Sequence, residues 1–201
     1  MRADCHVHSE ASDGWGTCEQ LAARAKEVGL DCIALTDHDT IEAHEEMARA
    51  CHKHKLGFIP GIEVSSRQGH ILGFWVQEKI PSGLSALATI DAIHKAGGLA
   101  AASHPYSFMP KGVARLSGSR LVGFDAVEVV NASPSMLLAN ARALRRFVAD
   151  PSAYAVLGNS DAHAVASVGS VVTTYPSSTN LRSAILSHST GVQVFPRPWY
   201  H

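Results

Sequence analysis

Short apolar segments alternate with amphipathic segments along the whole chain. Apolar runs of strand length occur at 2–7, 31–36, 70–76, 99–103, 126–131, 153–158, 168–175 and 192–195. Segments with apolar residues at helical spacing lie between them, at 17–28, 40–55, 82–96, 134–149 and 180–188. Strands that are separated by helices predict a mainly parallel sheet, and a count of about seven favours a small closed or distorted barrel over an open sheet.

Individual residues refine this α/β pattern. Thr17 is suited to cap the first helix and Gly29 to end it. In the apolar stretch that follows the second helix, Pro60 and Gly61 are expected to interrupt strand pairing. We find no internal repeat, low-complexity segment or linker, and a chain of 201 residues can bury roughly 70% of the surface of its unfolded form. We therefore expect residues 1–201 to form a single domain.

Charge and cysteine content exclude several classes of protein. Seventeen Lys and Arg residues against eighteen Asp and Glu residues give a net charge of −1, which disfavours extended binding to duplex nucleic acid or to an anionic membrane. The chain start lacks the pattern of a secretory signal, and no apolar run approaches membrane-span length. The four cysteines form no Cys-x-x-Cys pair, so a zinc ribbon or disulfide scaffold is disfavoured. We expect a reduced, cytoplasmic protein without membrane contact.

Histidine is the unusual feature of the composition, because the chain contains twelve. Histidine is the commonest metal-ligand side chain. The first strand ends in a segment where His6 and His8 share one face and Cys5 and Val7 the other, since side chains alternate along a strand. Other ligand types follow later strands: Asp37, His38, Asp39, Glu63, His104, Asp161 and His163.

In parallel α/β folds, and in barrels above all, this end of the sheet holds the active site. Each group also has a simpler interpretation: His6-x-His8 and Asp161-x-His163 can be incidental, and Asp39 can cap the following helix. The joint pattern of histidines and carboxylates at several strand ends nevertheless predicts a polynuclear metal site. A carboxylate such as Glu63 at the end of an apolar run strengthens this prediction, because its burial is costly unless it is paired or metal-bound.

The same residues resemble the motifs of the PHP (polymerase and histidinol phosphatase) superfamily. The chain contains, in order, Asp4-x-His6-x-His8-Ser9 with Ser12-Asp13-Gly14, Thr36-Asp37-His38-Asp39, Gly61-x-Glu63, Gly69-His70-x-Leu72-Gly73, Ser103-His104-Pro105 and Asn159-Ser160-Asp161-Ala162-His163. The resemblance covers essentially the whole chain. It implies a distorted (β/α)7 barrel of TIM-like type, which agrees with the strand count.

The resemblance also implies two to three divalent metal ions. The first would be held by His6, His8, Glu63 and Asp161, the second by Asp13, His38 and His163, and the third by Glu63, His70 and His104. Glu63 would then bridge two ions. Imidazole and carboxylate ligands without a thiolate suit zinc, manganese or iron equally.

Such a centre is suited to phosphate-ester hydrolysis, because closely spaced cations bind the phosphate, generate hydroxide from a shared water and stabilise the leaving oxygen. A water that bridges the first two metals is the expected nucleophile. Asp37 and Asp39 are candidates to orient a ligand imidazole. His38 or an adjacent acid is the candidate to assist the leaving group.

Cationic side chains near the mouth of the site are expected to bind substrate phosphate, and the candidates are Arg67, Lys111 and Arg115. Only 56 residues separate His104 from Asp161, whereas nucleotide-hydrolysing relatives carry an insertion there. We therefore expect an open site that accepts a small phosphomonoester, a nucleotide or a short oligonucleotide end. The remaining six histidines are assigned no role: His44, His52, His54, His94, His188 and His201.

Two other functions are compatible with the sequence. One is a metallohydrolase that acts on a non-phosphate amide or ester bond, because related barrels use similar metal clusters. The other is a non-catalytic metal-bound accessory domain. All nine implied ligands are present, and this favours an enzyme over the accessory role.

Overall fold

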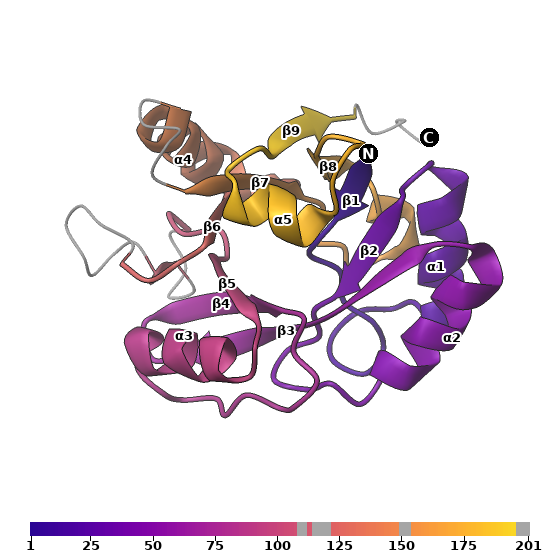
Figure 1. The fold of residues 1–201 in the computed structure, drawn as a ribbon, viewed down its shortest axis with the longest axis horizontal. Coiled ribbons are helices and arrows are strands. Elements are labelled where there is room, and N and C mark those ends of the chain that lie inside the picture. The colour runs from indigo at the N-terminus through magenta and orange to yellow at the C-terminus, as the bar shows by residue number, and fades with distance from the viewer. Residues whose placement is uncertain (108–111, 114–121, 149–153, 196–201) are drawn as a thin grey trace.

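A computed structural model describes residues 1–107, 112–113, 122–148 and 154–195 (Figure 1). The two candidate phosphate-binding residues Lys111 and Arg115 lie outside these ranges. The strands are β1 (Arg2–Asp4), β2 (Cys32–Leu35), β3 (Gly57–Ser66), β4 (Gly69–Phe74), β5 (Leu99–Ala102), β6 (Ala126–Asn131), β7 (Ala155–Asn159), β8 (Val171–Thr174) and β9 (Gly191–Val194). The α-helices are α1 (Cys18–Glu27), α2 (His44–His54), α3 (Ala86–Lys95), α4 (Leu137–Val148) and α5 (Leu181–Leu186).

The nine strands form one sheet in the order β7-β6-β5-β4-β3-β2-β1-β8-β9. Four neighbouring pairs are parallel, and four, namely β3/β4, β4/β5, β1/β8 and β8/β9, are antiparallel. The expected barrel-like α/β fold is confirmed, but the expectations of about seven strands and of a mainly parallel sheet are wrong. Two antiparallel pairs arise because β4 follows β3 without a helix between them and so runs against both of its neighbours, β3 and β5. The other two arise because β8 runs against β1, and because β9, which follows the short helix α5, runs against β8.

β3 gains a second neighbour halfway along, at the Pro60-Gly61 pair. Up to Pro60 the strand pairs in parallel with β2, and from Gly61 onward it pairs antiparallel with β4. Pro60 has no N–H to donate, and a Cβ on Gly61 would lie 3.0 Å from the Leu35 carbonyl oxygen. The sequence signal at these positions therefore marks the start of pairing with β4 rather than the expected break in the strand, and Glu63 still forms a parallel bridge with His38, which follows β2.

The sheet closes into a barrel where its two ends meet. The chain beyond β1 pairs in parallel with the chain beyond β7 through a bridge between Val7 and Ala162. Farther along, the Thr173 hydroxyl of β8 donates to the Gly158 carbonyl at 3.0 Å and accepts from the Gly158 N–H at 3.1 Å. The barrel is thus closed by a few separate hydrogen bonds rather than by a continuous ladder of paired strands.

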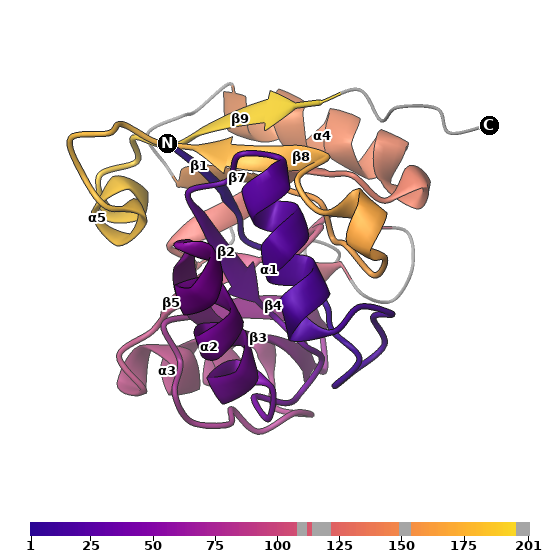
Figure 2. The same ribbon diagram turned by 90° about the vertical axis from the view of Figure 1, so that its right-hand side faces the viewer.

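The barrel is filled with small side chains, and the helices cover its outside. Inward-facing alanines pack with a few bulky residues: Ala3, Ala34, Ala101, Ala126, Ala155, Leu72, Phe74 and Leu157. Helices α1 and α2 lie together on one side, and α3 and α4 lie on the other (Figures 1 and 2). The expected cap and stop of α1 are confirmed, because Thr17 forms a capping box with Gln20 and Gly29 has φ of +75°.

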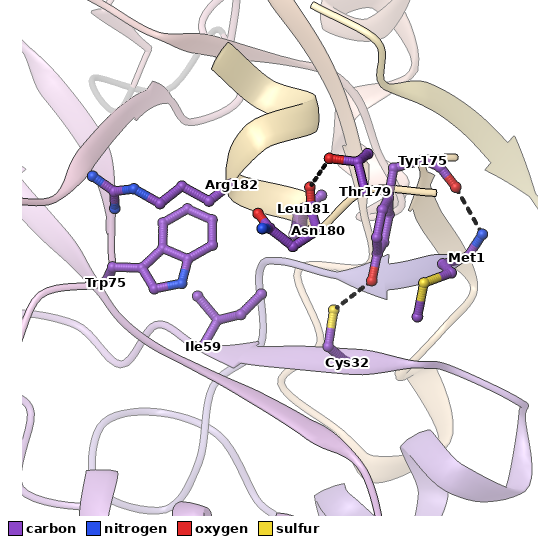
Figure 3. Close-up of a pocket in the computed structure, with 9 residues that line it drawn as sticks. All are labelled: Met1, Cys32, Ile59, Trp75, Tyr175, Thr179, Asn180, Leu181 and Arg182. Atoms are coloured by element: carbon purple, nitrogen blue, oxygen red, sulfur yellow. Dashed lines mark hydrogen bonds between the residues drawn. The ribbon is translucent and has the colours of Figure 1, made fainter. Parts of the chain in front are cut away.

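The end of the barrel at which β1 and β2 begin is closed by α5, whose apolar residues Leu181 and Ile185 pack into the core. A cavity of about 470 Å³ remains there, between Trp75, Cys32 and the start of α5 (Figure 3). The guanidinium of Arg182 lies 5.2 Å from the centre of the Trp75 ring on one wall. All four cysteines are buried and free of disulfides. Among the described residues, no helix is both long and apolar enough to span a bilayer.

Candidate metal centre

The opposite end of the barrel gathers nine polar side chains from across the sequence. They follow β1, β2, β5 and β7, lie on β3 and β4, or lie in the loop before α1, and the sequence singles out all nine: His6, His8, Asp13, His38, Glu63, His70, His104, Asp161 and His163. Three compact groups of possible ligand atoms occur among them: His8, Asp13, His38 and His163; His6, His8 and Asp161; and His38, Glu63 and His70.

Glu63 lies at the centre of the cluster, and its two carboxylate oxygens face different histidines. Oε2 lies 3.2 Å from His6 Nε2, 3.4 Å from His8 Nε2 and 3.3 Å from His38 Nδ1. Oε1 lies 3.1 Å from His70 Nδ1 and 3.3 Å from His104 Nε2. This arrangement is suited to a carboxylate that bridges two ions.

Asp161 completes the deepest part of the cluster. Its Oδ1 lies 3.2 Å from His6 Nε2 and 3.3 Å from His8 Nε2. Its backbone has φ of +51°, which is costly for a residue with a Cβ, by about 1–3 kcal/mol. The Asn131 amide donates to the other oxygen, Oδ2, at 3.1 Å and so fixes the orientation of the carboxylate.

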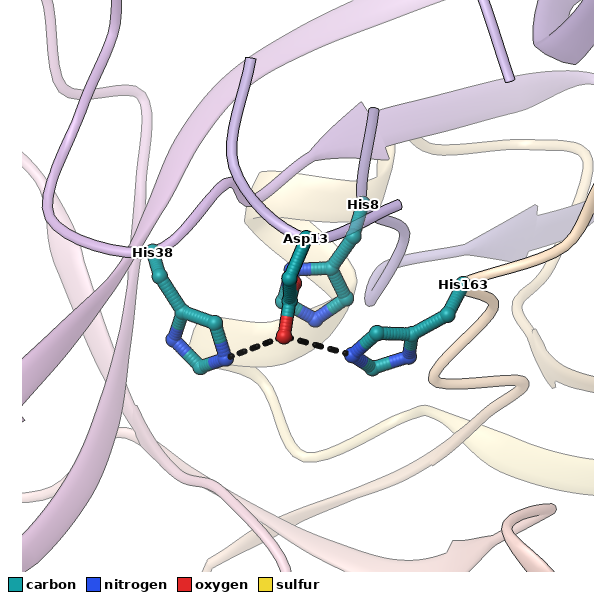
Figure 4. A group of neighbouring side chains, drawn as sticks. All are labelled: His8, Asp13, His38 and His163. Carbon is teal, nitrogen blue, oxygen red and sulfur yellow. Dashed lines mark ion pairs between the residues drawn. The ribbon is translucent and has the colours of Figure 1, made fainter. Parts of the chain in front are cut away.

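Asp13, His38 and His163 form the outer part of the cluster (Figure 4). Asp13 Oδ2 lies 3.7 Å from His38 Nε2 and 3.3 Å from His163 Nε2. The side chains of Asp13 and His163 are 52% and 41% exposed, so this part opens to solvent. His8 Nδ1 also lies 3.6 Å from Asp13, so His8 faces this group as well as the deep one, whereas the family pattern implies only the deep one.

The chemistry of these residues fits metal ions. Five buried imidazole nitrogens make no hydrogen bond in the described structure: His6 Nε2, His8 Nδ1 and Nε2, His38 Nδ1 and His104 Nδ1. Buried polar atoms normally have a partner. Most of these nitrogens lie 3.2–3.4 Å from carboxylate oxygens without hydrogen-bond geometry. Ligands that each lie about 2.0–2.2 Å from one zinc ion are about 3–3.5 Å apart, so the spacing matches.

The cluster also perturbs the pKa values of its members. Burial alone raises the pKa of Glu63, but the charge of His6 and hydrogen bonds from neighbouring histidines hold it well below its usual range. The pKa of Asp161 is lowered in the same way, against the effect of burial, chiefly by His6 and His8. Burial lowers the pKa of His6, yet Asp161, Glu63 and Glu128 outweigh it and raise that pKa well above its usual value. In the absence of metal, a proton on His6 therefore offsets the carboxylate charge.

The remaining candidates occupy other positions. Asp37 is buried and accepts hydrogen bonds from Ser9 and from the Ser12 hydroxyl at 2.6 Å, which fixes the loop that carries Asp13. Asp39 accepts from the Ser65 N–H at 2.8 Å, so it anchors β3 and caps no helix. The described hydrogen bonds of both carboxylates thus go to serines rather than to imidazoles. The exposed Arg67 donates to the Gly83 carbonyl at 2.9 Å.

Several residues around the cluster escaped the sequence interpretation. Ser103 donates to Glu63 Oε1 at 2.8 Å, and the His44 ring bonds to the Gly61 carbonyl at 2.7 Å, which makes His44 more than a surface residue. Glu128 on β6 bonds to His6 Nδ1 at 3.0 Å. The only feature of the sequence that points to Glu128 is its position as a charged residue inside an otherwise apolar strand segment. A carboxylate buried in such a segment needs a partner.

A barrel that carries histidines and carboxylates around shared centres at its catalytic end defines the class of metal-dependent hydrolases. Comparison with known families agrees: the model of the PHP domain matches residues 4–148, and that of a PHP-associated segment matches residues 138–190. The chain belongs to the PHP domain family, and the resemblance seen in the sequence is confirmed.

Individual relatives cover different shares of the chain. Uncharacterized protein MJ1587 of Methanocaldococcus jannaschii is 34% identical in an alignment of 145 residues that covers 66% of this chain and 82% of that protein. The 3′,5′-nucleoside bisphosphate phosphatase of Chromobacterium violaceum is 34% identical in an alignment of 91 residues that covers 43% of this chain and only 32% of the phosphatase.

Among solved structures, a two-domain protein from Bacteroides vulgatus containing a predicted PHP-like metal-dependent phosphoesterase superposes with a TM-score of 0.77. The match has 17% sequence identity and covers 97% of this chain and 65% of that one. At this identity the match supports the fold alone.

Proposed function

We propose that this chain hydrolyses a phosphate ester in a small phosphomonoester, a nucleotide or a short oligonucleotide end, with two to three divalent metal ions. The observation that carries the proposal is the set of buried imidazole nitrogens without hydrogen bonds around Glu63 and Asp161. The matching segment of a nucleoside bisphosphate phosphatase supports the choice of substrate class. Because the cluster combines residues from β1 to the loop beyond β7, we propose that residues 1–201 act as one domain.

The proposed ligand sets are those of the family pattern. His6, His8, Glu63 and Asp161 would hold the deep ion, Asp13, His38 and His163 the outer ion, and Glu63, His70 and His104 the third. The compact groups support these sets in part, since they also join His8 to the outer set and His38 to Glu63 and His70. Zinc, manganese and iron each suit these ligands. When bound, such ions supply Lewis acidity toward a phosphate oxygen and lower the pKa of a coordinated water.

Residues of the chain prepare the site for this chemistry. Asp37 holds the loop that presents Asp13, and Asp161 is held from behind by Asn131. The exposed outer group is the part of the cluster that a phosphate ester arriving from solvent would meet first. Burial lowers the pKa of His38 and so favours its neutral form, which is the form that binds a metal ion, so the proton for the leaving oxygen is assigned to an adjacent acid.

Activity assays with reconstituted protein test the proposal. The metal-free protein is loaded with Zn²⁺, Mn²⁺ or Fe²⁺ and assayed on a nucleoside bisphosphate, a sugar phosphate, a 5′-phosphorylated trinucleotide and an acyl amide. We expect metal-dependent release of phosphate or nucleotide and no amide cleavage. Activity on the amide alone would replace the phosphoesterase by the amidohydrolase alternative, and inactivity on every substrate with metal bound would favour the accessory role.

A matched pair of variants controls for general loss of structure. His163→Gln removes an outer group of the cluster, whereas His54→Gln removes a histidine that pairs with Glu19 away from it. The first variant is expected to lose at least about a hundredfold in kcat/KM and the second to retain wild-type activity. Equal activities of the two variants would contradict the assignment of the outer group.

A further inference from the structure

Glu128 is a buried carboxylate that touches the cluster without belonging to the proposed ligand sets. It is 1% exposed and accepts four hydrogen bonds. Oε1 accepts from His6 Nδ1 at 3.0 Å and from the Asn159 amide at 2.9 Å, and Oε2 accepts from the His104 N–H at 2.8 Å and from the Asn131 amide at 2.9 Å. We propose that Glu128 is a positioning residue that sets the ligand geometry of the deep and third metal sites at once. This inference rests on the proposed metal centre but not on its substrate.

The contact with His6 decides which ring nitrogen is available to a metal. A carboxylate can only accept, so the hydrogen bond places the His6 proton on Nδ1. The lone pair of Nε2 is then directed at the space between Glu63 Oε2 and Asp161 Oδ1, each 3.2 Å away. A carboxylate behind a ligand imidazole in this way fixes its tautomer and raises its basicity.

The second oxygen of Glu128 reaches two further parts of the cluster. The N–H that it accepts belongs to His104, whose backbone has the unusual φ of +25°. The Asn131 amide that donates to Glu128 also donates to Asp161 Oδ2, so the Asp161 carboxylate is connected to Glu128 through one side chain. Proposed ligands that follow β1, β5 and β7 are thereby all connected by hydrogen bonds to one buried carboxylate on β6.

The local sheet supports this role. The pairing of β6 with β7 shifts register between Glu128 and Val130, next to the carboxylate. Bulges of this kind commonly re-aim side chains beside active sites. Asn159, the last residue of β7, uses its amide nitrogen for Glu128 and its oxygen to accept from the Cys5 N–H at 3.0 Å, so the chain directly after β1 is tied to the same network.

Replacing Glu128 by Gln tests the requirement for a full acceptor. The amide group has nearly the same size, but one oxygen becomes an NH₂ group that faces two donors in either orientation. If the NH₂ faces His6, this ring must accept at Nδ1 and carry its proton on Nε2, where the metal would bind. If the NH₂ faces the other way, it opposes the His104 N–H and the Asn131 amide. We expect Zn²⁺ affinity, measured by competition with a chromophoric chelator, to fall about 10- to 100-fold.

Asp125→Asn is the matched control, because Asp125 also bonds to a histidine ring and to a backbone N–H. It accepts from His94 Nε2 and from the Ala100 N–H, both at 2.8 Å, directly before the start of β6 and so away from the cluster. Wild-type Zn²⁺ affinity is expected for this variant. If Glu128→Gln does not fold, Glu128→Asp takes its place, and this shortened carboxylate is expected to weaken Zn²⁺ binding less than tenfold. Wild-type affinity in the folded Glu128 variant would overturn the proposal.

A measurement on the unaltered protein gives an independent test. Long-range ¹H–¹⁵N spectra of the Zn²⁺-loaded chain report which nitrogen of the assigned His6 ring carries hydrogen. A proton on Nδ1 supports the proposal, and a proton on Nε2 overturns it. Neither readout depends on turnover, so a protein that binds Zn²⁺ through this network but cleaves no phosphate ester would contradict the proposed function alone.

Discussion

The two ends of the barrel are built from the same strands but use their buried polar atoms differently. At the end around α5, Cys32 Sγ and the Tyr175 hydroxyl contact each other at 3.5 Å, and the Thr190 hydroxyl between α5 and β9 is a lone buried polar atom without a hydrogen bond, far from any group of possible metal ligands among the described residues. At the other end, five buried imidazole nitrogens make no hydrogen bond among the described residues. The difference identifies one end as adapted for binding an ion and the other as adapted for holding the barrel together.

Backbone strain does not separate the two ends. Of the six described non-glycine residues with positive φ, Asp39, His104 and Asp161 lie at the cluster end, and Lys55, Trp75 and His188 lie at the other. Strained backbone is often taken as a sign of function. In this protein the unsatisfied nitrogens, and not the positive φ values, distinguish the functional end.

Removing a proposed ligand of the deep ion or of the third ion is expected to have the largest effect on this contrast. Asp161→Ala and, separately, His104→Ala should lose bound metal and reduce kcat/KM by at least about a thousandfold, because the ions supply most of the expected chemistry. Metal content is measured by elemental analysis of protein purified without chelator. Unchanged metal content and activity in both variants would refute the ligand assignment.

A cavity at the opposite end should act on stability alone. Ile185 of α5 is fully buried, so Ile185→Ala is expected to lower the free energy of unfolding by about 2–5 kcal/mol. Urea unfolding gives this value, and metal content per folded molecule should stay at the wild-type level. A variant that loses metal in proportion would show that the two ends are coupled.

The shifted pKa of His6 makes metal binding and metal-free stability respond to pH in opposite directions. A metal must displace the His6 proton, so its affinity is expected to fall as pH decreases, by up to about tenfold per pH unit for each displaced proton. A histidine with a raised folded-state pKa stabilises the fold fully below the unfolded value of about 6.5 and loses this effect as pH rises through the raised value. Zn²⁺ titrations and metal-free melting curves at several pH values should therefore slope oppositely, and parallel trends would contradict the shift.

Relief of backbone strain is expected to have the smallest effect on stability, and it compares a positive-φ residue at each end of the barrel directly. Lys55 ends α2 with φ of +53°, so Lys55→Gly should stabilise the protein by about 0.5–1 kcal/mol. Asp39 has nearly the same φ, but its side chain accepts from the Ser65 N–H, so Asp39→Gly should bring no gain. Equal stabilisation by both substitutions in thermal melts would indicate that Asp39 contributes nothing beyond its backbone.

The sequence predicts the site better than it predicts the sheet. Seven of the nine singled-out residues converge because each follows or lies on a strand, and strand ends can be located from apolar runs. The other two, Asp13 and His70, were identified only through the family motifs. Strand partners cannot be located in this way. The apolar run that contains Pro60 has the same sequence pattern whether the strand pairs with one neighbouring strand or with two. The antiparallel pairs were missed for this reason.

Glu128 and Asp37 show a second limit. A lone acidic residue in an apolar strand indicates that a partner exists, but the partner of Glu128 lies 122 residues away, and no local pattern identifies it. Asp37 stands among ligand types in the sequence, yet serines from the preceding loop occupy its oxygens. Local spacing predicts which residues carry chemistry, and only the folded contacts decide which of them face one another.

The way in which the barrel closes bears on the order of assembly. The bridge between Val7 and Ala162 joins segments from opposite ends of the chain, and His6, His8, Asp161 and His163 flank it. Contacts of such long sequence separation form late in folding, because loop closure costs entropy before it is rewarded. We therefore predict that the proposed deep ligands come together only when this bridge forms, so the rate of Zn²⁺ uptake during refolding, measured by stopped flow, should equal the rate of barrel closure.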